Sequence, residues 1–220
     1  MSAARVLVVH CHPSPESLAA AVRDAVCDAL RDRGDRVDLL DLYAEGFDPA
    51  MSRAEWEGYH EEGPNLAPIR PHAERLAEAE ALIFTYPTWW FGQPAMLKGW
   101  LERVMVPGFA FVMPDASRGP RPGLTHIRRI GVFTTCGASR LTSHLVGLPG
   151  KRILLRGLRG NCHPGARTCY HALYEIDSAP REKCAAFLAR IPQRIDRLLG
   201  ARTLPLPAAG SLARRNLDGA

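Results

Sequence analysis

The sequence predicts one doubly wound α/β domain with a five-stranded parallel sheet of order 2-1-3-4-5 and helices on both faces. The chain has 220 residues, which suits one domain better than two, and 46% of them are hydrophobic, enough for a sizeable core. Short apolar runs alternate along the chain with segments whose apolar residues recur at helical spacing. Strands that alternate with helices form right-handed βαβ units, which build a parallel sheet. We therefore assign residues 1–199 to one domain and residues 200–220 to a C-terminal tail.

The first half of the chain contains three predicted strands and three predicted helices. The strands cover residues 5–10, 37–42 and 81–86, and we expect Pro87 to end the third. The helices cover residues 16–33, 71–80 and 94–106. Gly34 supplies the stop signal for the first of these helices. Residues 43–70 are rich in glycine and proline, which predicts an irregular surface excursion.

The second half continues the alternation after a loop at residues 107–126, which is rich in proline and glycine. Strands are predicted at residues 127–135 and 166–176. Residues 139–160 read as mostly helical with an interruption near Pro149-Gly150, and residues 181–199 as one amphipathic helix. These five strands complete the predicted sheet.

Composition excludes several classes of protein. The net charge is +5, but the basic residues are scattered, and the nearest approach to a basic stripe is Lys151, Arg152, Arg156 and Arg159. We therefore expect no nucleic-acid partner. No apolar run approaches the ~18 residues that span a bilayer, and no secretory signal precedes the first strand, so we expect a cytoplasmic protein without membrane insertion. The cysteines and histidines show no metal-ligand spacing, so we expect no metal.

Three loops should carry the chemistry, because ligands in this fold bind beyond the carboxyl ends of the strands at the switch point. The first, residues 12–17, lacks G-x-G-x-x-G but offers His12, serine hydroxyls and helix N-terminal N–H groups. It reads either as a phosphate site or as a helix cap, with Ser14 as the cap and Pro15 at the first helical position. The two interpretations are compatible.

The second and third loops differ in character. Residues 87–94 contain three consecutive aromatic residues, Trp89, Trp90 and Phe91, which cannot all be core. They form either the wall of a site for a flat heterocycle or an aromatic turn packed on the next helix. The small residues at 134–138 would let a planar ring approach the backbone closely.

Residues 86–111, YPTWWFGQPAMLKGWLERVMVPGFAF, resemble the signature of the NAD(P)H:quinone oxidoreductases of the flavodoxin-like fold. The start, VLVVHCHPSPES, resembles the first strand and the flavin phosphate loop of the same family, and TTCG resembles its Thr-Thr-Gly-Gly. The resemblance covers residues 5–137. It implies a flavodoxin-like fold, a tightly bound flavin that is usually FAD, with FMN left open, and a homodimer with active sites at the interface.

The resemblance also implies roles for particular residues. The flavin phosphates would lie along His12, Ser17, Leu18 and Ala19. The isoalloxazine would lie along Pro87, Thr88, Trp89, Trp90 and Phe91 on one side and Thr134, Thr135, Cys136 and Gly137 on the other. The quinone pocket would be lined by Trp90 and, from the other subunit, by Phe109, Ala110 and Phe111.

The chain departs from the family at several positions. Leu18-Ala19 stands where Phe-Asn is common, and Cys136 replaces the first glycine of the doublet. Thr142 occupies the spacing of a tyrosine that steadies the reduced flavin, which leaves the out-of-register His144 as the only candidate catalytic residue.

The predicted function is transfer of two electrons from NAD(P)H through the flavin to a quinone or similar small acceptor. One alternative is a regulatory flavoprotein subunit of a glutathione-gated potassium efflux system, and another is a one-electron carrier of flavodoxin type.

Overall fold

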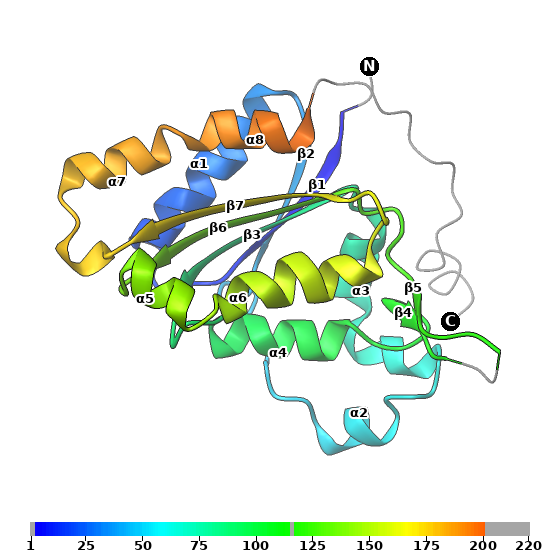
Figure 1. The fold of residues 1–220 in the computed structure, drawn as a ribbon. Coiled ribbons are helices and arrows are strands. Elements are labelled where there is room, and N and C mark those ends of the chain that lie inside the picture. The colour runs from blue at the N-terminus through cyan, green and yellow to red at the C-terminus, as the bar shows by residue number, and fades with distance from the viewer. Residues whose placement is uncertain (1–2, 115–116, 201–220) are drawn as a thin grey trace.

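The computed structural model describes residues 3–114 and 117–200, and its centre is a five-stranded parallel sheet (Figure 1). The strand order is β2-β1-β3-β6-β7, which is the predicted order 2-1-3-4-5 when the strands of this sheet are counted along the chain. The strands are β1 (Arg5–His10), β2 (Arg36–Asp41), β3 (Ala81–Thr88), β6 (Arg129–Cys136) and β7 (Arg167–Tyr174). The predicted fold class is confirmed. Residues 201–220 of the predicted tail lie outside the described residues.

Helices cover both faces of the sheet, as a doubly wound topology requires (Figure 1). One face carries α1 (Leu18–Asp32), α7 (Arg181–Leu188) and α8 (Ile191–Leu199). The other carries α3 (Arg70–Glu78), α4 (Ala95–Val104) and the helical run that begins at α6 (Pro149–Arg152). The two layers therefore bury two separate apolar clusters, one on each side of the sheet.

The central strands β1, β3 and β6 form because their residues are mostly apolar on both sides, as in sheets covered by helices on both faces. Every residue of β3 up to Pro87 is buried, and β1 is buried from Val6 onward. Trp100 of α4 is 0% exposed and packs edge-on against Phe84, with ring centroids 6.3 Å apart. The core on this face is thus built around large rings.

Two predicted boundaries are wrong. Strand β3 does not end at Pro87 but continues to Thr88, with Pro87 in register with Thr135 of β6. The final helix is not continuous: α7 ends at Leu188 and α8 begins at Ile191. Pro192 lies in the first turn of α8, where its missing N–H costs no intrahelical hydrogen bond.

The excursion predicted as irregular contains short helices, α2 (Arg53–Glu57) and the 3₁₀ helix η1 (Pro64–Ile69). A capping box starts α2: the Ser52 hydroxyl accepts from the Glu55 backbone, and the Glu55 carboxylate accepts from the Ser52 backbone. The segment packs closely on α4, because a Cβ on Gly99 would lie 2.2 Å from the Pro49 carbonyl oxygen. The excursion is therefore docked on the domain.

The predicted loop at residues 107–126 is more structured than expected, and the predicted helical stretch at residues 139–160 is divided into more pieces than expected. The loop at 107–126 contains a two-stranded antiparallel ladder of β4 (Phe111–Val112) and β5 (Arg121–Pro122). The helical stretch is divided into α5 (Arg140–Leu145), α6, the π-helix η2 (Ile153–Gly157) and the 3₁₀ helix η3 (Leu158–Asn161). Among residues 3–114 and 117–200, no helix is both long and apolar enough to cross a membrane.

Candidate functional site

The second and third predicted loops meet at the carboxyl edge of the sheet and form one open cavity of about 360 Å³. Strands β3 and β6 bring them together, because Thr88 at the end of β3 pairs with Cys136 at the end of β6. The cavity is lined by Pro87, Thr88, Trp89, Trp90, Phe91, Thr135, Cys136, Gly137, Ala138, Ile176 and Asp177. It therefore contains all five residues predicted in the second loop and three of the four predicted in the third.

The aromatic wall of this cavity is a tight turn. Trp89 and Gly92 exchange backbone hydrogen bonds of 3.2 and 3.0 Å, and the two central residues, Trp90 and Phe91, have φ angles of +49° and +63°. Positive φ is costly for bulky aromatic residues, and such strain occurs frequently at ligand-binding sites. The turn leaves Trp90 95% exposed. Gln93 Nε2 donates to the Gly150 carbonyl at 2.7 Å and anchors the turn on α6.

The first loop presents a hydrogen-bond donor beside this wall. His12 Nδ1 lies 3.0 Å from both the backbone nitrogen and the carbonyl oxygen of Ser14, and the Ser14 N–H can only donate. In the tautomer in which Nδ1 accepts from the Ser14 N–H, the proton of the neutral imidazole lies on Nε2, which is then a donor. The imidazole lies 6.0 Å from the ring of Trp89. His12 thus connects the first loop to the aromatic turn.

Helix α1 begins next to His12, and Ser17 rather than Ser14 is its N-cap. The Ser17 hydroxyl accepts from Ala20 N at 3.1 Å and donates to the Ser14 carbonyl at 2.9 Å. The predicted cap at Ser14 is therefore wrong, because the helix starts two residues later than expected. The N–H groups of Leu18 and Ala19 belong to the first turn and have no intrahelical acceptor. With His12, they provide donors of the kind that bind an anion at a helix N-terminus.

The third loop approaches the cavity with small residues. A Cβ on Gly137 would lie 2.7 Å from a carboxylate oxygen of Asp177, so a side chain at this position would displace the Asp177 carboxylate. Thr134 does not line the cavity as predicted: its hydroxyl is buried and donates to the Tyr86 carbonyl at 2.7 Å. Thr134 also lies 2.9 Å from the Thr88 hydroxyl, so it ties the two strand ends together.

Some predicted site residues lie elsewhere. Phe109 and Ala110 are both 0% exposed and belong to the hydrophobic core, so the prediction that they line a pocket is wrong for this chain. Phe111 is half-buried at the start of β4 and packs against the same core. His144 is exposed on α5, where Nδ1 lies 2.7 Å from the Arg140 carbonyl, and it does not line the cavity. No geometry therefore supports His144 as a catalytic residue.

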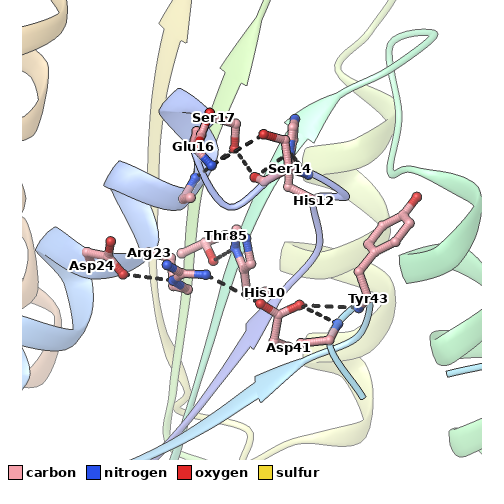
Figure 2. A network of polar contacts seen from close by, with 12 residues as sticks. His10, His12, Ser14, Glu16, Ser17, Arg23, Asp24, Asp41, Tyr43 and Thr85 are labelled. Carbon is pink, nitrogen blue, oxygen red and sulfur yellow. Dashed lines mark hydrogen bonds and ion pairs between the residues drawn. The ribbon is translucent and has the colours of Figure 1, made fainter. Parts of the chain in front are cut away.

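A polar network under the first loop was not predicted (Figure 2). Buried His10 at the end of β1 lies 2.9 Å, through Nδ1, from the Thr85 hydroxyl of β3. Arg23 of α1 pairs with Asp41 of β2 at 3.3 Å, and Asp41 also accepts from the backbone N–H of Tyr43. Burial lowers the pKa of His10 from 6.5 to about 4, against the opposing effect of Asp41. The network ties β1, β2, β3 and α1 together beneath the His12 loop.

Ile176 and Asp177 are cavity residues that sequence reasoning also missed. They follow β7, the last strand of the sheet. The signal was available, because all parallel strands end at the same edge, so the segment after the fifth strand also reaches the crevice. Among residues 3–114 and 117–200, no three His, Cys, Asp or Glu side chains gather as a metal site.

The sheet order, the His12 loop at the start of α1 and the aromatic cavity beyond β3 and β6 together define a flavodoxin-like protein. A family model described as "Flavodoxin-like fold" matches residues 4–163, and the chain belongs to this family.

The resemblance to NAD(P)H:quinone oxidoreductases is confirmed by relatives. NAD(P)H dehydrogenase [quinone] 1 of Cavia porcellus is 37% identical in an alignment 163 residues long, which covers 66% of this chain and 58% of the relative. Ribosyldihydronicotinamide dehydrogenase [quinone] of Pongo abelii is 31% identical over 52% of this chain and 56% of the relative. The chain thus spans little more than half the length of these two proteins.

Solved structures show the same architecture. Smu.1420 of Streptococcus mutans is 26% identical with a TM-score of 0.75, over 86% of this chain and 97% of that one. The NAD(P)H:quinone oxidoreductase of Methanothermobacter marburgensis has a TM-score of 0.75 at 22% identity, over 92% and 100% of the two chains. The second likeness concerns the fold alone.

Proposed function

We propose that this protein is a flavoprotein oxidoreductase that uses NAD(P)H to reduce a quinone or a similar small acceptor by two electrons. The observation that carries the proposal is the aromatic cavity at the carboxyl edge of the sheet, with the donors of His12 and α1 beside it. The quinone-reducing relatives named above support this assignment.

The residues present fit a flavin. A flat heterocycle needs an apolar wall with backbone groups at its edge, and the strained Trp89–Gly92 turn provides both. The small residues Gly137 and Ala138 also line this cavity. His12 Nε2 and the first N–H groups of α1 would hold the phosphates. When bound, the flavin accepts and returns the electrons, and the protein positions it and excludes competing reactions.

We propose FAD as the cofactor and FMN as the alternative. An FMN-dependent NADH-azoreductase from Bacillus anthracis, solved in complex with FMN, has a similar fold, with a TM-score of 0.72 at 15% identity. The fold therefore accommodates FMN. Mass spectrometry of the cofactor released from purified protein distinguishes the two. Oxidation of NADH and of NADPH with a quinone then tests the activity. A protein that binds neither flavin would contradict the proposal.

We also propose a homodimer with shared sites. Trp100 of α4, a residue suited by sequence to either the core or a dimer interface, is buried in the core. Exposed apolar residues instead lie on and after α5, where Leu141 is 71% and Leu145 79% exposed. Exposed apolar clusters of this kind mark interaction sites. Sedimentation should give twice the chain mass, and Leu145→Arg should shift the protein toward monomer, whereas the exposed-site control Arg53→Ala should not.

Two measurements distinguish the proposed oxidoreductase from the two alternative functions. A stable one-electron state on reductive titration would favour the electron carrier, and co-purification with a membrane antiporter would favour the regulatory subunit of a potassium efflux system. No observation on the described residues favours either alternative. The cytoplasmic location stays a prediction.

A further inference from the structure

A second, much smaller cavity shares lining residues with the aromatic turn, and five of its ten lining residues carry a hydroxyl group. We call it the hydroxyl chamber and define it by the side chains of Tyr86, Ser143, Tyr170 and Tyr174 together with Lys151. Its volume is about 10 Å³, roughly the space for one water molecule. Thr88, Phe91 and Cys136 line both this chamber and the 360 Å³ cavity, so the two spaces are neighbours.

Two tyrosine hydroxyls of the chamber are linked by a hydrogen bond, and its three tyrosines are protonated. Tyr170 and Tyr174 share a hydrogen bond, which raises the pKa of Tyr170 and lowers that of Tyr174, so Tyr174 is the better acid of the pair. Burial nevertheless keeps the pKa values of Tyr86, Tyr170 and Tyr174 above the usual range. All three side chains therefore carry their protons at neutral pH.

Charged and titratable groups face the pair from several elements. The Lys151 ammonium of α6 lies 5.1 Å from the Tyr170 ring centroid. Arg140 of α5 lowers the pKa of Tyr174 electrostatically, whereas Cys136 of β6 raises it. Cys136 Sγ is 3.6 Å from the Ser143 hydroxyl. The cations would stabilise a transient negative charge on a tyrosine oxygen.

Tyr174 is the member of the pair next to the larger cavity. It lies at the carboxyl end of β7 and pairs in register with Cys136, which lines both spaces. Tyr170 pairs with Val132, four residues further from that edge of the sheet. The order from the interior to the cavity is thus Tyr170, Tyr174 and then the site.

We propose that the hydroxyl chamber supplies the proton consumed in quinone reduction, with Tyr174 as its donor and Tyr170 as the residue that positions it. This inference rests on the proposed function. A quinone becomes a hydroquinone by gaining two electrons and two protons, whereas the hydride of NAD(P)H carries two electrons and one proton. One further proton must therefore enter the site in each turnover.

In this step the O–H bond of Tyr174 breaks and its proton moves toward the cavity, where a new O–H bond of the hydroquinone forms. The hydrogen bond from Tyr170 stabilises the phenolate that remains. A proton from solvent, passed through the water-sized space of the chamber, restores Tyr174. Atoms and charge balance over the turnover, with no oxidant or reductant beyond NAD(P)H and the quinone.

Tyr174→Phe tests the inference, because it removes only the hydroxyl. Turnover with a quinone should fall about 10²-fold or more, the usual contribution of a positioned proton donor. Turnover with ferricyanide, which accepts electrons without protons, should stay at the wild-type rate. The dissociation constant of the flavin should also stay unchanged. Tyr170→Phe should give a smaller loss with the quinone and a changed solvent deuterium isotope effect.

Tyr59→Phe is the matched control, because Tyr59 also donates from a part-buried hydroxyl, to the Met105 carbonyl at 3.3 Å, but lies outside both cavities. It should leave both acceptors unaffected. Equal losses of Tyr174→Phe with quinone and ferricyanide, or no loss with either, would overturn the proton-donor role. Failure of the wild-type protein to bind flavin would instead overturn the proposed function.

Discussion

Replacing His12 with alanine should weaken flavin binding without unfolding the protein. Nδ1 lies 3.0 Å from the backbone nitrogen and from the carbonyl oxygen of Ser14, and the ring lies 6.0 Å from that of Trp89. The Ser14 backbone belongs to a partly exposed loop, where water can replace the imidazole. The alanine variant lacks the Nε2–H donor, and it therefore loses one hydrogen bond to the flavin phosphates beside the start of α1. A hydrogen bond to a charged phosphate contributes about 1–3 kcal/mol. The dissociation constant of the flavin should therefore rise roughly 10- to 100-fold.

The assay is fluorescence titration of flavin with the apoprotein, alongside thermal unfolding without flavin. His12→Gln provides a chemical control, because its amide can donate from about the position of Nε2 and should recover part of the affinity. His144→Ala provides a positional control, because this exposed histidine lies outside the cavity. If His12→Ala binds flavin as tightly as the wild type, the phosphates do not lie at this loop and the reasoning fails.

Three further predictions concern stability and the acceptor. Gly99→Ala places a Cβ 2.2 Å from a backbone carbonyl and should destabilise the protein by about 1–3 kcal/mol or more in urea unfolding, whereas Gly92→Ala, with no atom within 4 Å, should not clash. Burial lowers the pKa of His10 to about 4, so the unfolded chain binds a proton that the folded chain does not. Stability should therefore fall from about pH 6.5 to pH 4 by up to about 3 kcal/mol, and an equally strong pH dependence in His10→Asn would exclude this origin. Phe109→Ala truncates a core residue and should lower the free energy of unfolding by about 3–5 kcal/mol. Phe111→Ala should raise the KM of the acceptor and leave the flavin content unchanged. Loss of flavin from Phe111→Ala would show that this loop supports the cofactor instead.

The comparison of sequence and structure is clearest at the ends of the strands. Apolar runs bounded by turn residues located all five strands of the main sheet, and parallel topology then placed the loops after β1, β3 and β6 at one edge. The local sequence pattern was sufficient to locate the strands, because strand formation, burial and chain direction all favour the same arrangement. Boundaries were less well predicted: β3 runs through Pro87, since a strand end depends on its neighbours as well as on its own residues.

The individual site residues show where sequence reasoning stops. Thr134 and Thr135 are adjacent and chemically alike, yet one hydroxyl ties two strands together and the other residue lines the cavity. Alternation along a strand separates such neighbours, but only the packed sheet decides which side faces the site. Likewise, the family resemblance implied that Phe109 and Phe111 would line one pocket, whereas the fold buries Phe109 completely.

The sequence by itself determined the fold class, the strand order and the three loops that surround the site, because these follow from periodicity and from motifs that are continuous in the chain. Only the tertiary structure decided which side chains converge. Tyr174 and Cys136 are far apart in sequence, as are His10, Asp41 and Arg23, and each set meets through strand register and helix packing. Such meetings depend on long-range contacts, which leave no local periodic signal in the sequence.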